Sequence, residues 1–243
     1  MLFNKIIQIP VVESTNNYVA NMMNNSQIAH GTVILAEHQT NGKGQREAKW
    51  ESEANKNLTF SLFLKNEPIS IVNGFYLNKI ISISLINLLI SNRIFAKIKW
   101  PNDIYVLDKK IAGILIENNI KNEKIDSSII GVGLNVNQFS FNIHKATSMK
   151  KEKNIEYDLR DLLYLFLDEF QVNFSLFESK NFKQINELYI QNLYLYNEWA
   201  IFQDKTGIWE GKIFGVDEFG CLQIENRKGE MNTFLNKEIN FLF

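Results

Sequence analysis

The chain has 243 residues, of which 45% are apolar and 12% aromatic, and its formal net charge is −1. This length and apolar content suit one substantial domain with a small appendage and exclude an intrinsically disordered chain. The balanced charge differs from the strongly basic composition that is typical of nucleic-acid-binding proteins. The single cysteine, Cys221, excludes an internal disulfide framework and a cysteine-rich metal site. We therefore expect a folded protein of the reducing cytoplasm.

The first half of the chain predicts two helices among several strands. The stretch before residue 14 is too short and too polar for a signal peptide, and we assign it no element. Ser14 is a good N-cap for a short helix over residues 14–25, with Tyr18 and Val19 on its apolar face. A long helix is expected over residues 72–91; polar residues interrupt its apolar run, so we interpret it as a buried helix and not as a membrane span. Apolar, β-branched runs predict strands over residues 32–36, 58–64, 96–100, 104–107, 111–116 and 128–135.

The second half predicts two more helices and then a change of pattern. Apolar residues recur at helical spacing over residues 157–178, a further helix is expected over 182–193, and short strands follow from Trp199. Because several consecutive strands have no helix between them, the sheet should be mixed and mostly antiparallel, with the helices on one side. The expected fold class is α+β, with a main domain over residues 1–194 and a small β-barrel over residues 195–243.

One polar segment with glycines follows the second predicted strand. AEHQTNGKGQREAKWES, residues 36–52, carries Gly42, Lys43 and Gly44. Backbone N–H groups freed by glycine and placed beside cations suit an anion. The segment has neither the Walker A spacing nor the dinucleotide fingerprint, and taken alone it is more simply interpreted as a mobile basic turn.

Two further segments lie at or within the predicted strands. KWPND, residues 99–103, offers a cation, an amide and a carboxylate, which together can hold a phosphate, a purine and Mg²⁺; an ordinary turn between strands is the alternative. GVGLNVN, residues 131–137, alternates glycines within an apolar strand, and Gly113 interrupts another strand. Such glycines indicate the close approach of a ligand or, equally, of another backbone.

In this order, the segments resemble those of the biotin–protein ligases, which attach biotin to the carrier domains of carboxylases. The matching stretches are ESTNNYV (13–19), AEHQTNGKGQREAKW (36–50), KWPNDIYV (99–106), KIAGILIE (110–117), GVGLNVN (131–137) and KATSM (145–149). The tail GVDEFGCLQIE (215–225) looks like the SH3-like C-terminal barrel of that family. The resemblance covers nearly the whole chain, and the spacing of KWPND and KIAGILIE is its most specific part.

The resemblance implies an ATP-dependent ligase that forms biotinyl-5′-AMP and transfers biotin to a lysine of the biotin carboxyl carrier domain of acetyl-CoA carboxylase or a related carboxylase. The residues implied in catalysis are Lys110, Lys43 and Asp103. Those implied in biotin binding are Ser14, Thr15, Asn16, Gln39, Gly42, Lys43, Gly44, Gln45, Lys110, Gly113, Gly131 and Gly133. Those implied in ATP binding are Arg46, Trp50, Lys99, Asn102, Asp103 and Asn135, with Asp103 as the candidate ligand of Mg²⁺. Hydroxyl and amide side chains such as Ser14 and Gln39 supply the donors and acceptors that a ureido group needs.

The glycine-containing loop departs from the GRGRxGRxW pattern of that family. Lys43, Gln45 and Glu47 stand where the pattern has two arginines and a glycine. Arginine binds phosphate and carboxylate with two parallel hydrogen bonds, whereas lysine is a point charge and glutamine is neutral. We therefore expect this loop to retain biotinyl-AMP less tightly than the family pattern would.

Other functions remain open at this stage. A lipoate or octanoate ligase would need an apolar tunnel in place of the ureido-binding set. A non-catalytic biotin or nucleotide sensor would be expected to lack Lys110 or Asp103, and both are present. Since the ESTN motif begins at Glu13, we expect no N-terminal winged helix and hence no DNA partner. We also expect no membrane partner, and a monomer or weak homodimer.

Overall fold

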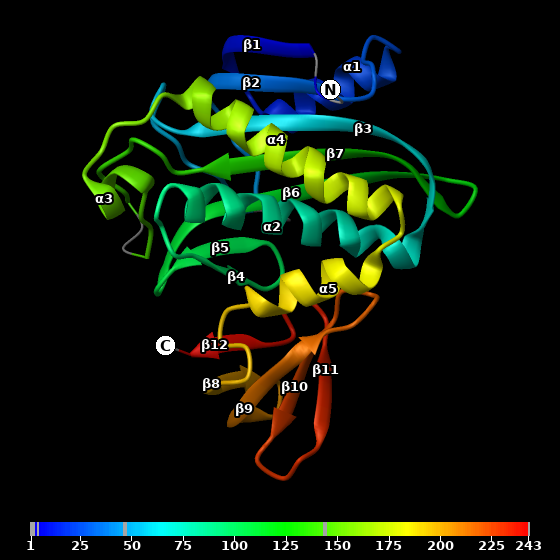
Figure 1. Cartoon of the computed structure of the whole chain (residues 1–243), viewed down its shortest axis with the longest axis vertical. Coiled ribbons are helices and arrows are strands. Elements are labelled where there is room, and N and C mark those ends of the chain that lie inside the picture. Colours follow the sequence, from blue (N-terminus) through cyan, green and yellow to red (C-terminus); the bar gives the residue numbers. More distant parts are fainter. Residues whose placement is uncertain (1–2, 4, 46–47, 143–144, 243) are drawn as a thin grey trace.

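A seven-stranded sheet forms the middle layer of the structure, a computed structural model that describes residues 3–242 other than 4, 46–47 and 143–144 (Figure 1). The strand order is β1-β2-β3-β7-β6-β5-β4. The strands are β1 (Lys5–Val12), β2 (Thr32–Gln39), β3 (Leu58–Ser70), β4 (Lys97–Lys99), β5 (Asp103–Val106), β6 (Lys109–Lys121) and β7 (Lys124–Leu134). Only the pair β1–β2 is parallel among these neighbours, so the predicted mixed and mostly antiparallel sheet is confirmed.

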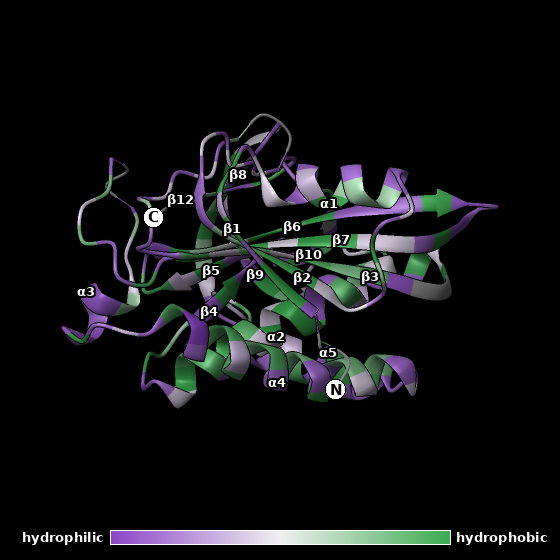
Figure 2. Cartoon of the chain, turned by 90° about the horizontal axis from the view of Figure 1, so that it is seen from above, coloured by the Kyte–Doolittle hydropathy of each residue, from purple (hydrophilic) through white to green (hydrophobic). Residues whose placement is uncertain are grey.

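A group of helices covers one face of this sheet, and a further helix lies on the other face (Figure 2). The first group is α2 (Phe75–Ser91), preceded by the 3₁₀ turn Ile71–Gly74, with α4 (Leu159–Glu178) and α5 (Phe182–Gln191). α1 (Thr15–Asn24) lies opposite them, where Val19 packs in a separate small core with Ile34 and Phe63. The expectation that all helices lie on one side is therefore wrong for α1. α1 covers only part of its face, and the uncovered part carries the cavity described below.

The helix α2 is buried because it is apolar on nearly every side. It lies between the sheet and the helices α4 and α5 (Figure 2). The segment Ile71–Ser91 is long and apolar enough to cross a membrane, but 78% of its apolar window is buried inside the structure. The prediction of a buried helix is confirmed. The amphipathic α4 packs Phe166 and Phe170 inward, and the Asp158 carboxylate caps its first turn by accepting from two backbone N–H groups.

Some elements differ from the sequence prediction. β1 has no predicted counterpart, because it is a half-exposed edge strand without clear alternation; it also contains Pro10, which only an edge tolerates. The short helix α3 (Met149–Lys153) was not predicted either. Tyr18 is 37% exposed and does not join the apolar face of α1.

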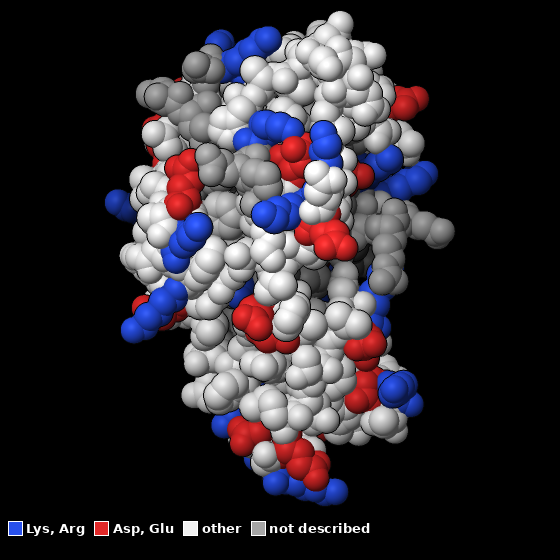
Figure 3. All heavy atoms as spheres, turned by 90° about the vertical axis from the view of Figure 1, so that its right-hand side faces the viewer, with Lys and Arg blue, Asp and Glu red and all other residues white. Residues whose placement is uncertain are grey.

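The C-terminal residues form a second, five-stranded antiparallel sheet in the order β11-β10-β9-β8-β12. Its strands are β8 (Trp199–Asp204), β9 (Gly207–Val216), β10 (Leu222–Asn226), β11 (Met231–Phe234) and β12 (Asn240–Leu242). It is joined to the main sheet by the Trp100 indole N–H, which donates to the Gly220 carbonyl at 2.8 Å. On the face drawn in Figure 3, basic and acidic side chains are interspersed and no broad surface of one sign is visible.

A buried lysine lies where α2 meets α5. The Lys79 side chain is 1% exposed, and its Nζ donates to Asn186 Oδ1 at 2.7 Å. The ammonium lies 4.8 Å from the Tyr76 ring centroid and 5.5 Å from those of Phe75 and Tyr189. Burial lowers the pKa of Lys79 to about 8, although the carboxylate of Asp217 acts in the opposite direction.

This lysine predicts a pH-dependent stability. Between pH 8 and the ordinary lysine pKa of 10.5, the unfolded chain binds more protons than the folded one. The free energy of unfolding should therefore rise with pH in this window, by about 1 kcal/mol per pH unit. Urea unfolding of Lys79→Met at pH 8 and 9.5 should lack this rise, whereas Lys183→Met, at an exposed position of α5, should keep it. An undiminished rise in Lys79→Met would contradict the assignment.

Candidate functional site

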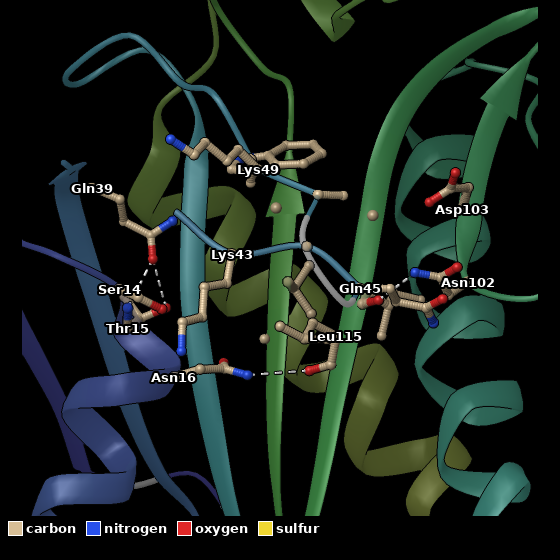
Figure 4. A pocket seen from close by; sticks show the side chains of 18 of the residues that line it. Ser14, Thr15, Asn16, Gln39, Lys43, Gln45, Lys49, Asn102, Asp103 and Leu115 are labelled. Atoms are coloured by element: carbon tan, nitrogen blue, oxygen red, sulfur yellow. Dashed lines mark hydrogen bonds between the residues drawn. The ribbon is translucent and has the colours of Figure 1, made fainter. Parts of the chain in front are cut away.

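A cavity of about 230 Å³ opens on the sheet face beside α1. Its walls come from the start of α1, the end of β2, the middle of β6 and β7, and the turn before β5 (Figure 4). Of the residues expected from the sequence, it brings together Ser14, Thr15, Asn16, Gln39, Lys43, Gly44, Gln45, Trp50, Asn102, Asp103, Lys110, Gly113, Gly131 and Gly133. Gly42 lines a neighbouring cavity. Arg46 lies outside the described residues.

The end of the cavity beside α1 is polar. Gln39 Oε1 accepts from the backbone N–H of Thr15 at 2.8 Å and lies 3.1 Å from its hydroxyl oxygen. Asn16 Nδ2 reaches the Leu115 carbonyl at 3.4 Å, as Figure 4 shows. The same Nδ2 donates to Glu117 Oε2 at 2.7 Å. Ser14 takes the predicted N-cap position but makes no side-chain capping bond, so the helix does not use its hydroxyl.

The strand glycines make room for side chains of the protein itself. A Cβ at Gly131 would lie 2.4 Å from Asn16 Oδ1, and a Cβ at Gly133 would lie 2.3 Å from the Trp50 ring. At Gly113 the nearest atoms would be Lys110 Cε and Nζ at 3.1 Å and the Trp50 ring at 3.3 Å. The glycines therefore allow an amide and an indole to lie flat on the sheet and form the cavity walls.

The loop residues 42–45 and 48–50 fold back on one another and place Trp50 over these strands. The Trp50 backbone N–H donates to the Gly42 carbonyl at 2.9 Å, and the Gly44 N–H donates to Ala48 at 2.7 Å. Lys43 Nζ donates to Asn17 Oδ1 at 2.7 Å, and Gln45 Oε1 accepts from Asn236 Nδ2 at 2.6 Å. The loop is thus attached to α1 on one side and to the C-terminal segment on the other.

Lys110 lies at the wall shared by this cavity and a second one of about 420 Å³. Its Nζ is 2.6 Å from Asp103 Oδ1, and both side chains are partly exposed. In a regular strand, Lys110 and Gly113 would face opposite sides, since side chains alternate. The register between β5 and β6 shifts at Ile104/Tyr105, so that Ile111 is the extra residue of a bulge. This bulge turns both Lys110 and Gly113 toward the cavity.

The second cavity holds other residues expected at a nucleotide. Trp50 and Asn135 line it, together with Tyr105, Lys49 and Lys145. Asn135 Nδ2 donates to the Thr147 carbonyl at 3.0 Å, which holds the 145–147 segment next to Lys110.

Lys99 lines neither cavity. Its Nζ lies 3.4 Å from the Tyr105 hydroxyl and 5.2 Å from the Phe241 ring centroid. Burial lowers the pKa of Lys99 despite the nearby Asp103 carboxylate, and burial raises the pKa of Tyr105 to about 12. Its role at ATP stays a prediction.

The model of the Biotin/lipoate A/B protein ligase family matches residues 8–135 of the chain. The chain belongs to this family. The matched region contains every cavity-lining residue that the sequence predicted.

Individual members of the ligase family resemble the chain over most of its length. The bifunctional ligase/repressor BirA of Escherichia coli (strain K12) is 26% identical over 241 residues, which are 96% of this chain and 72% of that protein. Biotin–protein ligase 1, chloroplastic, of Arabidopsis thaliana is 29% identical over 83% of this chain and 56% of that protein. The solved structure of biotin protein ligase from Aquifex aeolicus in complex with biotin and ATP has a TM-score of 0.81 and 26% identity, over 98% of each chain.

Four contributors to this ligase-family site are not among the site residues expected from the sequence. Lys49 lines both cavities, and Lys237 brings the C-terminal segment to the first one. Ser61 and Glu117 do not line the cavity but form hydrogen bonds with Thr15 and Asn16, which do. Ser61 is the polar residue within the stretch FSLFL (60–64) and Glu117 ends the KIAGILIE stretch, and these were the available signals.

We predict that Gly133→Ala displaces Trp50. The added methyl group would overlap the indole, so its emission should shift to longer wavelength and stability should fall by about 1–3 kcal/mol. The measurement is intrinsic fluorescence with a Trp50→Phe background for subtraction, together with urea unfolding. Gly215→Ala is the matched control, because its nearest atoms would lie at 3.7 and 4.0 Å. Unchanged Trp50 emission in Gly133→Ala would contradict the packing described.

Proposed function

We propose that the chain is an ATP-dependent biotin–protein ligase, which forms biotinyl-5′-AMP and transfers biotin to a lysine of a carboxylase carrier domain. The observation that carries the proposal is the position of Lys110, in the wall between two cavities. An ammonium in this place can meet a carboxylate from one cavity and a phosphate from the other. Relatives named as biotin–protein ligases, and the solved structure of the Aquifex aeolicus ligase with biotin and ATP, support the same activity.

The first cavity suits biotin. Its polar end, with Thr15, Asn16 and Gln39, offers donors and acceptors to a ureido group. Trp50, which lies over Gly113 and Gly133, provides an apolar wall for the fused rings, and Lys110 lies at the end where the carboxylate would arrive. A lipoate or octanoate chain would leave the polar end unpaired, which is costly for buried polar groups.

The second cavity suits ATP. The cations Lys49, Lys110 and Lys145 line it and can meet a triphosphate, and Trp50 offers a ring beside it; the carboxylate residues Glu51 and Glu53 line it as well. No group of three or more His, Cys, Asp or Glu side chains gathers for a metal within the described parts of the chain. Mg²⁺ is usually held by one or two carboxylates and by substrate phosphates. Asp103 lines the first cavity and pairs with Lys110 at the shared wall; it would hold the ion there, and the ion would neutralise charge on the phosphates.

In the first half-reaction, a carboxylate oxygen of biotin attacks the α-phosphorus of ATP, and pyrophosphate leaves with its bonding electron pair. Negative charge grows on the phosphoryl oxygens, so the protein contributes mainly by aiming cations at them. Lys110 is the first of these, because Asp103 holds its ammonium in place at 2.6 Å. Lys43, at the loop, and Lys49 can add to this stabilisation.

In the second half-reaction, the ε-amine of the acceptor lysine attacks the acyl carbon, the C–O bond to AMP breaks, and the nitrogen loses a proton. The mixed anhydride is already reactive, so positioning and exclusion of water account for most of the enzyme's share. Asp103, a carboxylate that lines the first cavity, is the proposed acceptor of this proton.

The C-terminal sheet, residues 195–243, is proposed as an SH3-like domain that follows a catalytic domain over residues 1–194. Support comes from its short strands in an all-antiparallel order and from the Gln45–Asn236 contact, by which it attaches to the loop. We further propose a cytoplasmic location, where ATP and carboxylase carrier domains are available.

The activity test is an intact-mass measurement on a biotin carboxyl carrier domain. The carrier is incubated with the protein, Mg-ATP and an equimolar mixture of biotin, lipoate and octanoate. We expect a single biotin adduct, with a rate about 100-fold lower for Lys110→Ala because a charge-stabilising group is lost. Lys109→Ala is the matched control, since Lys109 is the exposed neighbour on the same strand and should leave the rate unchanged. A lipoyl or octanoyl adduct would refute the proposal.

A second test concerns retention of the intermediate. Gln45→Arg restores the arginine of the family pattern. A guanidinium group near the phosphate should slow the release of biotinyl-AMP several-fold, because it can bind the phosphate with two hydrogen bonds. Asn236→Ala should accelerate release, because it frees Gln45 from its partner in the C-terminal segment. The measurement is the rate at which biotinyl-AMP is released from preformed enzyme–adenylate complexes. Release from Gln45→Arg that is as fast as from wild type, or faster, would contradict a role of position 45 in retaining the intermediate.

A further inference from the structure

A chain of hydrogen bonds runs behind the polar end of the first cavity, from Glu117 to Gln39. Glu117 Oε2 accepts from Asn16 Nδ2 at 2.7 Å. The Ser61 hydroxyl oxygen lies 2.6 Å from Asn16 Oδ1 and 2.7 Å from Thr15 Oγ1. Thr15 in turn contacts Gln39 Oε1 through its backbone N–H at 2.8 Å and its hydroxyl at 3.1 Å. Five side chains from β6, α1, β3 and β2 are thus connected in one series.

The two residues that organise this series do not face the cavity. Ser61 is fully buried in β3, and Glu117 lies near the exposed end of β6; neither belongs to the cavity lining. The three residues they connect, Thr15, Asn16 and Gln39, all line it. Ser61 and Glu117 therefore act on a bound molecule only through those three side chains.

The donors and acceptors of the series fix the orientation of its two amide side chains, Asn16 and Gln39. An ionised carboxylate only accepts hydrogen bonds, so Glu117 requires the Nδ2 end of the Asn16 amide and turns Oδ1 toward Ser61. Ser61 has one proton to donate, and Asn16 Oδ1 can only accept it. At the other end, Gln39 Oε1 accepts from the Thr15 backbone, so that Nε2 remains the donor that Gln39 offers.

The Asn16 side chain is enclosed. Asn16 is 3% exposed, and its Oδ1 packs so close to the backbone of Gly131 that a Cβ there would approach it to 2.4 Å. The amide therefore has two arrangements in the same place, related by exchange of its oxygen and nitrogen. The carboxylate of Glu117 selects one of them.

We infer that Glu117 and Ser61 are positioning residues that set which groups of the biotin pocket donate and which accept. A ureido group presents two N–H donors and one carbonyl acceptor, so a pocket with the opposite polarity would reject it. This inference rests on the proposed function and adds the basis of its selectivity for the ureido group.

The test compares biotin with 2-iminobiotin. In 2-iminobiotin a guanidino group stands in place of the ureido group, so that, when it is protonated, N–H donors take the place of the accepting carbonyl oxygen. Biotin-dependent ATP–pyrophosphate exchange and calorimetric binding are measured with the full chain. For Glu117→Ala we expect the KM for biotin to rise about 10-fold, because one charge-assisted hydrogen bond is lost. The KM for ATP should be unchanged. The preference for biotin over 2-iminobiotin should fall, and Glu117→Gln, which still has an accepting oxygen, should retain most of it.

Two further variants separate positioning from general destabilisation. Ser61→Ala should raise the KM for biotin in the same way, and the double variant should lose little more than either single one, because both act in one series. Glu187→Ala, at an exposed position of α5, should change nothing. An unchanged KM and preference in Glu117→Ala, with wild type active on biotin, would overturn this inference alone. Absence of biotin-dependent exchange in wild type would instead overturn the proposed function.

Discussion

The ion pair between Lys110 and Asp103 is the contact on which the site depends. It exists because the bulge at Ile111 brings Lys110 onto the same face of β6 as Gly113, within 2.6 Å of the carboxylate on β5. Without the bulge, the lysine would face the helices, where an ammonium would be buried among apolar side chains. A partly exposed pair of this kind contributes little to stability. Its value lies in holding a cation in the wall between two cavities.

One face of the sheet packs against the core and the other carries the first cavity. Both follow from the strand pleat, because successive side chains of a strand point to opposite faces. Phe60 and Leu62 of β3 point toward α2 and α4 and belong to the main core, whereas Ser61 between them points toward α1 and bonds its side chains. The same alternation on β7 places Val132 in the core and leaves Gly131 and Gly133 beneath Asn16 and Trp50. A rigid, fully packed face therefore supports a face that is open enough to receive small molecules.

The sequence predicted the long helices and the inner strands because their apolar periodicity is strong. It did not predict β1, whose pattern is weak, or the position of α1, since periodicity does not say which face of a sheet a helix covers. The chemistry of Lys110, Asp103 and the Ser14–Asn16 stretch came from the family resemblance, and the structure brings these residues together. Ser61, Glu117 and Lys237 could not be predicted, because their roles come from contacts between residues far apart in the chain. The interpretation of the strand glycines was incomplete for the same reason: Asn16 and Trp50 fill the space above them.

The proposed chemistry joins a biotin carboxylate in one cavity to the α-phosphorus of ATP in the other. It is tested most directly with biotin labelled with ¹⁸O in its carboxylate, in a complete reaction with a carrier domain. If the carboxylate attacks the α-phosphorus and the amine then attacks the acyl carbon, one labelled oxygen must end in AMP. We predict that mass spectrometry finds the label in AMP and none in pyrophosphate. Biotinylated carrier formed with unlabelled AMP, or with label in pyrophosphate, would contradict this account.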